Sequence, residues 1–200
     1  MRKALTHLKA ADPVMERIIG SVGPFRMVYR EPVFETVVRS IVYQQVSGKA
    51  AASIFSRVVA AMPRGITPRS VLKFRVEELR ALGLSQQKAA YILDLADKTQ
   101  RKRVCFEGLC DLDDEQVIAT LTEVKGIGVW TAQMFLMFAL KRPDVFPTAD
   151  LGVRSAMKKA YGLEELPNAK EMERMAEPWR PYRSVASWYL WRTLDGPATL

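Results

Sequence analysis

The sequence is poor in the two side chains that most often hold metal ions. It contains 2 cysteines and 1 histidine in 200 residues. Two thiols cannot supply the four thiolates of an iron–sulfur cluster or of an all-cysteine zinc site, so neither centre is expected. Cys105 and Cys110 are therefore predicted to be reduced thiols that pack as small buried hydrophobic residues.

Long hydrophobic runs and an excess of acidic residues are also missing. No stretch reaches the ~20 apolar residues of a membrane span, and the N-terminus lacks the apolar core of a signal peptide, so a soluble cytoplasmic protein is expected, nucleoid-associated if bacterial. Lys and Arg number 30 against 22 Asp and Glu, which gives a net charge of +8. This balance favours a polyanionic partner such as nucleic acid, although a basic surface also serves solubility alone.

Apolar residues recur at helical spacing, whereas alternating runs of strand length are scarce. In the predicted helix at 33–46, for example, Phe34, Val37, Val38, Ile41 and Val42 share one face. After a polar N-terminal lead, further helices are predicted at 49–62, 85–100, 113–122, 129–141, 151–161 and 183–194. The sequence therefore predicts an all-α fold, in one unit that can be two-lobed.

A short segment with two glycines joins the predicted helices at 113–122 and 129–141. Gly126-Ile127-Gly128 leaves room only for a tight turn, in which Ile127 can anchor the chain in the core. The N–H groups of Gly128 and its successors, at a helix N-terminus, suit a phosphate. Taken alone, however, two such glycines are more typical of a plain corner between helices.

Asp150 follows the apolar helix at 129–141 and a connecting segment, at the start of the helix predicted at 151–161. An aspartate in this position is ordinarily a helix cap, stabilised by the helix dipole. The residue alone therefore does not distinguish a cap from a catalytic carboxylate.

Several segments together resemble one family. The string LTEVKGIGVWTA at 121–132 resembles the helix-hairpin-helix motif of base-excision DNA glycosylases, and VFPTADLGVR at 145–154 resembles the segment that carries their essential aspartate. The segments at 81–90 and 179–191 resemble bacterial 3-methyladenine DNA glycosylase II, in a short form without its N-terminal β domain. The resemblance implies a single glycosylase unit, with a middle lobe at about 32–140, a second lobe from 1–31 plus 141–200, and a cleft between them.

The same resemblance implies roles for three residues. Asp150 matches the catalytic aspartate, and Trp191 matches a tryptophan that stacks on the base. Trp130 stands where strand-cutting relatives carry a lysine nucleophile, so hydrolysis without lyase activity is expected. Trp130 and Trp191 would form a pocket for a positively charged alkylated purine, while the other aromatic residues near the C-terminus are expected in the core.

The resemblance also implies contacts with double-stranded DNA that contains damaged bases. Gln45 stands at the position that intercalates into the duplex, with Gln44 beside it, and Lys49 and Lys88 are candidate phosphate contacts. Further contacts are expected around the hairpin, at Lys125, Gly126, Ile127, Gly128 and Thr131. In this family the hairpin can hold Na⁺ or K⁺ through backbone carbonyls, here those of Thr122, Val124 and Ile127. No other cofactor is required, and a monomer is expected.

The predicted function is thus a monofunctional glycosylase that removes alkylated purines, of the 3-methyladenine and 7-methylguanine type, by base flipping in base-excision repair. Two alternatives stay open. A non-catalytic helix-hairpin-helix DNA-binding module would explain the charge and the hairpin but not Asp150 together with Trp191. A glycosylase for an oxidised or mismatched base would explain all of these features.

Overall fold

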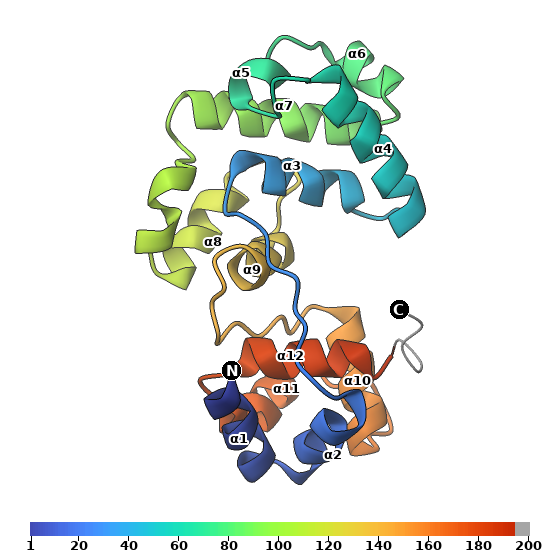
Figure 1. Cartoon of the computed structure of the whole chain (residues 1–200), viewed down its shortest axis with the longest axis vertical. Coiled ribbons are helices and arrows are strands. Elements are labelled where there is room, and N and C mark those ends of the chain that lie inside the picture. The colour runs from blue at the N-terminus through green and yellow to red at the C-terminus, as the bar shows by residue number, and fades with distance from the viewer. Residues whose placement is uncertain (195–200) are drawn as a thin grey trace. The chain divides into compact units, whose positions relative to one another are not determined.

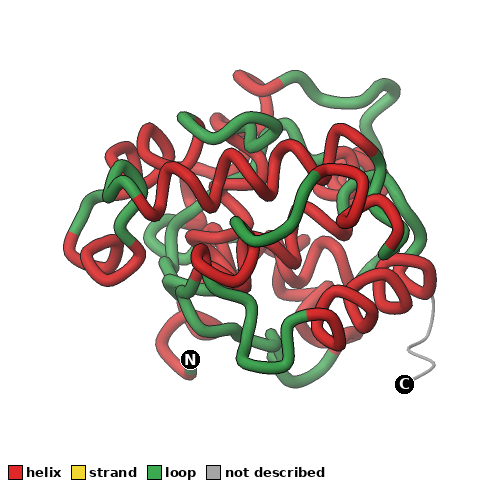
Figure 2. The backbone as a smooth tube through the Cα atoms, turned by 90° about the horizontal axis from the view of Figure 1, so that it is seen from above, coloured by secondary structure: helices red, strands yellow, loops and turns green. Residues whose placement is uncertain are grey.

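The computed structural model describes residues 1–194, and this part of the chain consists of helices and loops without strands (Figures 1 and 2). The all-α prediction is confirmed. None of the described helices is long and apolar enough to cross a membrane. The α-helices are α1 (Arg2–Ala11), α2 (Pro13–Val22), α3 (Phe34–Tyr43), α4 (Gly48–Ala61), α5 (Pro68–Val71), α6 (Val76–Ala81), α7 (Gln86–Gln100), α8 (Asp114–Thr122), α9 (Val129–Phe138), α10 (Leu151–Tyr161), α11 (Ala169–Ala176) and α12 (Arg183–Arg192); the 3₁₀ helices are η1 (Phe106–Asp111) and η2 (Glu177–Trp179).

The chain divides into two compact units. Unit 1 combines Met1–Tyr29 with Lys141–Leu200, and unit 2 is Arg30–Leu140. The sequence placed the corresponding lobes at 1–31 with 141–200 and at about 32–140. Each functional element can therefore be assigned to one unit: the hairpin lies in unit 2, and Asp150 lies in unit 1.

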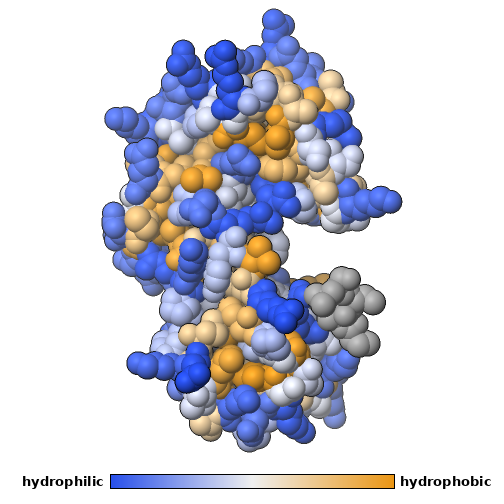
Figure 3. Space-filling view, in the orientation of Figure 1, coloured by the Kyte–Doolittle hydropathy of each residue, from blue (hydrophilic) through white to orange (hydrophobic). Residues whose placement is uncertain are grey.

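Unit 2 is built from α3 to α9, and its helix starts follow the local sequence signals. Asp113 and Gln116 form a capping box at the start of α8, and the side chains of Ser47, Thr67 and Ser85 cap α4, α5 and α7. Such caps satisfy N–H groups that have no partner inside the helix. In Figure 3 the hydrophilic side chains of this unit project outward, with apolar side chains showing between them.

Two predicted helices of unit 2 end earlier than expected. α3 ends at Tyr43 because Gln44, with ψ of 131°, leaves the helical path, and Gln45 after it is left-handed, with φ of 54°. α9 ends at Phe138 rather than at residue 141, and Lys141, the first residue of unit 1, is again left-handed, with φ of 57°. Apolar residues continue beyond both helix ends, which is why the periodicity extended the predictions too far.

The N-terminal lead, in which the sequence analysis predicted no helix, forms α1 and α2 of unit 1. Asp12 lies between α1 and α2, and its Oδ1 accepts hydrogen bonds from the first N–H groups of α2. Its Oδ2 accepts from the Trp179 indole N–H at 2.8 Å and from the Tyr161 hydroxyl. One buried carboxylate thus joins both N-terminal helices to distant parts of unit 1, which no local pattern indicates.

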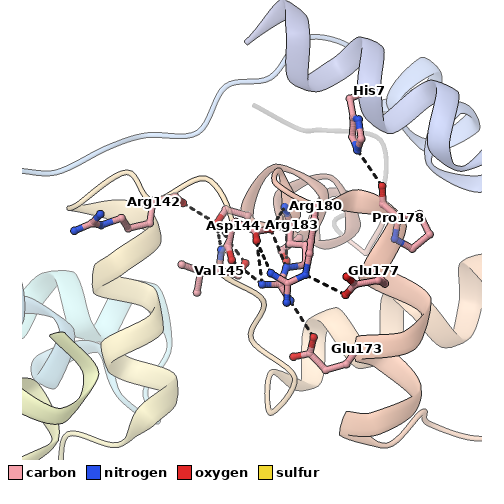
Figure 4. A network of polar contacts seen from close by, with 11 residues as sticks. His7, Arg142, Asp144, Val145, Glu173, Glu177, Pro178, Arg180 and Arg183 are labelled. Carbon is pink, nitrogen blue, oxygen red and sulfur yellow. Dashed lines mark hydrogen bonds and ion pairs between the residues drawn. The ribbon is translucent and has the colours of Figure 1, made fainter. Parts of the chain in front are cut away.

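The aromatic segment before the C-terminus fills the core of unit 1. Trp179 and Tyr189 are fully buried and Trp188 nearly so, which confirms the expectation that most of these aromatic residues are core residues. The start of α12 is held by a polar network (Figure 4), in which the Arg183 guanidinium donates to Asp144 at 2.8 Å and to Glu173 at 2.9 Å. This network fixes α12 against the segment that leads to Asp150.

The cysteine prediction was wrong. Cys105 and Cys110 are both exposed, one before and one inside η1. The buried residue of this short helix is Leu109, which is fully covered. Because η1 is a 3₁₀ helix with three residues per turn, its single buried position leaves both sulfurs on the solvent side.

Candidate functional site

Asp150 is the N-cap of α10 and is nearly buried, with 9% of its surface exposed. Its Oδ1 accepts a hydrogen bond from the Val153 backbone N–H at 2.7 Å. The same oxygen accepts a second one from the indole N–H of Trp191 at 2.8 Å. The structure thus brings the two predicted site residues of unit 1 into direct contact, and the indole ring of Trp191 is only half-buried.

A glycine makes this contact sterically possible. A Cβ atom at Gly152 would lie 3.0 Å from Oδ1 of Asp150 and 3.0 Å from Cδ1 of Trp191. Both distances are shorter than ordinary contacts of a methyl group, so any side chain here would push the indole away from the carboxylate. The sequence analysis missed Gly152, although a glycine in the first turn of a helix, where it weakens the helix, was a usable signal.

The hairpin joins α8 to α9 in unit 2. Gly126 is left-handed, with φ of 78°, and the ring of Tyr91 covers it so closely that a Cβ atom would lie 2.1 Å from the ring. Ile127 is buried at 4% exposure, as expected for an anchor, while Lys125 and Gly128 are exposed. Gly128 is the N-cap of α9 and has no side chain to cap it, so the first N–H groups of α9 lie at an exposed helix start.

One face of α7 holds the hairpin in place. The Asp94 carboxylate accepts a hydrogen bond from the Lys125 backbone N–H at 2.8 Å, and the Lys98 ammonium bridges Asp94 and the Glu123 carbonyl, both at 2.6 Å. Burial raises the pKa of Asp94, but the hydrogen bonds and charges of Lys98 and Lys125 outweigh it and leave this pKa below its usual value. The sequence analysis did not identify Asp94 and Lys98, which show only an ordinary i, i+4 spacing of opposite charges.

The predicted wedge lies beside the hairpin. The Gln44 side-chain amide donates to the Gly126 carbonyl at 3.0 Å, and the left-handed Gln45 is exposed. The Lys88 ammonium donates to the carbonyls of Val42 and Gln44 at 2.8 Å and 2.6 Å, so this candidate phosphate contact binds the protein's own backbone.

Several of the predicted site residues of unit 2 border one cavity of about 820 Å³. Trp130 lines it with 41% of its surface exposed, and Thr131 lines it from a nearly buried position at 8%. The same cavity is also lined by Gln44, Gln45 and Gly126, together with Arg39, Tyr43 and Tyr91. The structure therefore groups the predicted residues in two clusters, one in each unit. The unit 1 cluster is the Asp150–Trp191 pair.

Comparison with known proteins identifies the family of the chain. Residues 38–181 match the family described as HhH-GPD superfamily base excision DNA repair protein. The chain belongs to this superfamily, which confirms the family expected from the hairpin and the aspartate segment.

Relatives cover nearly the whole chain. DNA-3-methyladenine glycosylase 1 of Schizosaccharomyces pombe is 33% identical over 96% of this chain and 87% of that protein. DNA-3-methyladenine glycosylase 2 of Escherichia coli is 28% identical over 94% of this chain and 69% of that protein. The structure of a Schizosaccharomyces pombe 3-methyladenine DNA glycosylase in complex with abasic DNA superposes with a TM-score of 0.86 and 34% identity, over 96% of this chain and 97% of that one.

Proposed function

We propose that this protein is a monofunctional DNA glycosylase that hydrolyses the N-glycosidic bond of alkylated purines in double-stranded DNA during base-excision repair. The observation that carries the proposal is the Asp150 carboxylate, held at the start of α10 by the indole N–H of Trp191. The names of the relatives, which include 3-methyladenine glycosylases from yeast and bacteria, support the substrate class.

The chemistry follows from the charge that develops during bond cleavage. As the base leaves, positive charge builds on the deoxyribose, and a fixed carboxylate nearby stabilises it. The α10 N-terminus and the Trp191 N–H hold the charge and orientation of Asp150 before substrate arrives. Asp150 then stabilises the sugar cation and orients or deprotonates the attacking water. An alkylated purine already carries positive charge, so its departure needs no protonating residue.

The absence of lyase activity rests on Trp130. A glycosylase that also cuts the strand needs an amine to form a Schiff base with the sugar, and the corresponding position on α9 carries an indole. The indole faces of Trp130, in unit 2, and of Trp191, in unit 1, can each attract a cationic purine, because electron-rich rings attract positive charge. Water is therefore the nucleophile in this proposal.

The hairpin and the wedge bind the DNA. The exposed N–H groups at Gly128 and the start of α9, with the charge of Lys125 beside them, suit one phosphate of the backbone. Gln45 would fill the gap that a flipped base leaves, since unstacking a base costs a few kcal/mol. The structural relative from Schizosaccharomyces pombe is in complex with abasic DNA, which supports DNA as the ligand. We further propose that the protein acts as a monomer in the cytoplasm, at the nucleoid if the cell is bacterial.

We also propose Na⁺ or K⁺ at the carbonyls of Thr122, Val124 and Ile127. The neighbouring carbonyls of Glu123 and Gly126 are bound by the side chains of Lys98 and Gln44. Neutral carbonyl oxygens are hard ligands that suit such a cation, which would add positive charge beside the phosphate. Replacing K⁺ by tetramethylammonium at constant ionic strength is therefore expected to weaken DNA binding.

The test is release of base from duplexes that contain 7-methylguanine or 3-methyladenine. Wild-type protein is expected to release the base, and Asp150→Asn to lose at least about a hundredfold in single-turnover rate, as when a preorganised charge-stabilising group is lost. Asparagine caps helices as well as aspartate does, so this variant should keep its fold and its DNA affinity. Asp97→Asn, which neutralises a half-exposed carboxylate on α7 paired with Arg101, is the matched control and should keep full activity.

Each alternative predicts a different result. A DNA-binding module would bind these duplexes without releasing any base. A glycosylase of other specificity would release only oxidised or mismatched bases. Trapping with borohydride tests the missing lyase step, and a covalent protein–DNA adduct would contradict the proposal that the enzyme is monofunctional.

A further inference from the structure

One face of α7 contacts both segments that the proposed function assigns to DNA. Lys88, Tyr91, Asp94 and Lys98 follow one another at spacings of three or four residues, so they line the same side of the helix. Lys88 binds the end of α3, Tyr91 packs on Gly126, and Asp94 and Lys98 bind the hairpin backbone. The distance between wedge and hairpin is therefore set by one rigid helix.

Lys88 makes the contact nearest to the wedge. Its ammonium donates to the carbonyls of Val42 and Gln44, which lie at the C-terminal end of α3, where carbonyls have no partner inside the helix and a cation is favourable. Its side chain is partly buried, and desolvation lowers the pKa of the ammonium. Two of its three N–H donors thus bind backbone carbonyls of the polypeptide.

The residue that follows this contact has an unusual backbone. Gln45 is left-handed, with φ of 54°, a conformation that residues other than glycine seldom adopt and that needs support from its surroundings. The support comes through Gln44, whose carbonyl is held by Lys88 and whose side-chain amide is held by the Gly126 carbonyl. Both contacts are made within the polypeptide, so they can set the direction of Gln45 without a contribution from DNA.

We propose that Lys88 is a positioning residue for base flipping, which holds Gln45 in the left-handed conformation needed to enter the duplex. The inference rests on the proposed function, in which Gln45 fills the gap left by the flipped base. A wedge that is already ordered loses little conformational freedom on entry, so more of its contact energy is available to offset unstacking. Lys88 acts through Gln45 and does not bind a phosphate.

The test combines Lys88→Met, which keeps the length of the side chain without its donors, with Gln45→Ala and the double variant. Single-turnover base release is measured on a fully paired duplex and on one whose lesion faces an abasic site, where flipping is easier. Lys88→Met is expected to slow base release from the paired duplex about tenfold and from the second duplex less than about threefold. The reason is that a misplaced wedge matters only where stacking must be replaced. In the double variant, Lys88→Met should add little to Gln45→Ala, as expected for two residues that act through one step.

Salt dependence and stability complete the design. If Lys88 bound a phosphate, Lys88→Met would lower the slope of log affinity against log salt by about one. We expect the slope to match that of Lys73→Met, a control that removes an exposed lysine elsewhere in unit 2. Thermal unfolding shows whether the variants are folded. If the Lys88→Met protein is not folded, it is replaced by Lys88→Gln, which keeps an N–H donor. Lys88→Gln should slow base release from the paired duplex by a smaller factor.

The outcomes distinguish a failure of the proposed role of Lys88 from a failure of the proposed function. If Gln45→Ala slows paired duplexes and Lys88→Met slows both duplexes equally, adds fully to Gln45→Ala or lowers the salt slope, the role of Lys88 is overturned while the proposed function stands. If wild-type protein releases no alkylated base, the proposed activity is wrong. If Gln45→Ala has no effect on paired duplexes, the proposed wedge role of Gln45 is wrong. In either case the proposed role of Lys88 is overturned as well.

Discussion

The hydrogen bond between Trp191 and Asp150 can be removed without removing an aromatic ring. Trp191→Phe deletes the indole N–H, which lies 2.8 Å from Oδ1 of the carboxylate, and keeps a face on which a base can stack. The Val153 N–H still binds the same oxygen at 2.7 Å, so Asp150 keeps its role as a helix cap. The expected consequence is a carboxylate with one restraint fewer and an otherwise intact unit.

The size of the effect follows from the kind of bond. A hydrogen bond to a charged group contributes about 1.5–3 kcal/mol. If this energy is used to hold Asp150 in the orientation needed for the developing sugar cation, its loss lowers the rate of base release about 10- to 150-fold. Gly152→Ala should act on the same contact from the other side, since the added Cβ would lie 3.0 Å from both the carboxylate and the indole.

The assay is single-turnover release of 7-methylguanine, with the rate constant and the affinity for damaged DNA measured separately. Loss of the hydrogen bond should lower the rate constant, whereas weaker stacking should lower the affinity. Trp188→Phe, the same substitution one turn earlier on α12, is the control for core packing and should leave the rate constant of the folded protein unchanged. A Trp191→Phe protein with the wild-type rate constant would refute a positioning role for the indole N–H, and would leave stacking as its only role.

Three further predictions concern the scaffold. Gly126→Ala places a methyl group 2.1 Å from the Tyr91 ring at a left-handed position. It should lower the free energy of unfolding, measured in urea, by about 1–2 kcal/mol or more, and should weaken DNA binding, measured by fluorescence anisotropy. Arg183→Met removes the hydrogen bonds of the guanidinium to Asp144 and Glu173, while Asp144 keeps its ion pair with Arg180, and should lower the free energy of unfolding by about 1.5–3 kcal/mol, measured in urea. Burial, with the hydrogen bond and charge of Asp12, raises the pKa of Tyr161. The protonated form is thus stabilised below pH ~10, and this stability is lost as the pH rises further; Tyr161→Phe should flatten that alkaline loss in a series of melting curves.

The sequence predicted those features whose cause is local. The capping box at Asp113 and the anchor at Ile127 depend on residues within a few positions of one another, and the structure has both. The aspartate segment and the hairpin were also recognisable as strings. By contrast, the ends of α3 and α9 were set too late, because apolar residues continue past the last helical residue.

What the sequence could not predict depends on contacts between distant residues. Asp12 joins α2 to Trp179 and Tyr161 across more than 140 positions, and nothing in the polar lead indicates such partners. Lys88 looked like any other surface lysine, although its ammonium binds two carbonyls from α3 and the following turn. The role of such a charged residue can be recognised only when its partners in the folded structure are known.

Asp150 shows why one residue can support two interpretations. As a helix cap it needs only an acceptor oxygen, which asparagine or serine would supply equally well. A cap does not require the negative charge, yet nearly complete burial of a charge is costly unless hydrogen bonds offset it. Here the compensating donor is the indole of Trp191, brought from α12 and admitted by the missing side chain of Gly152. Capping α10 would need neither the indole of Trp191 nor the glycine that admits it. Their presence argues that the negative charge of Asp150 has a function beyond capping the helix.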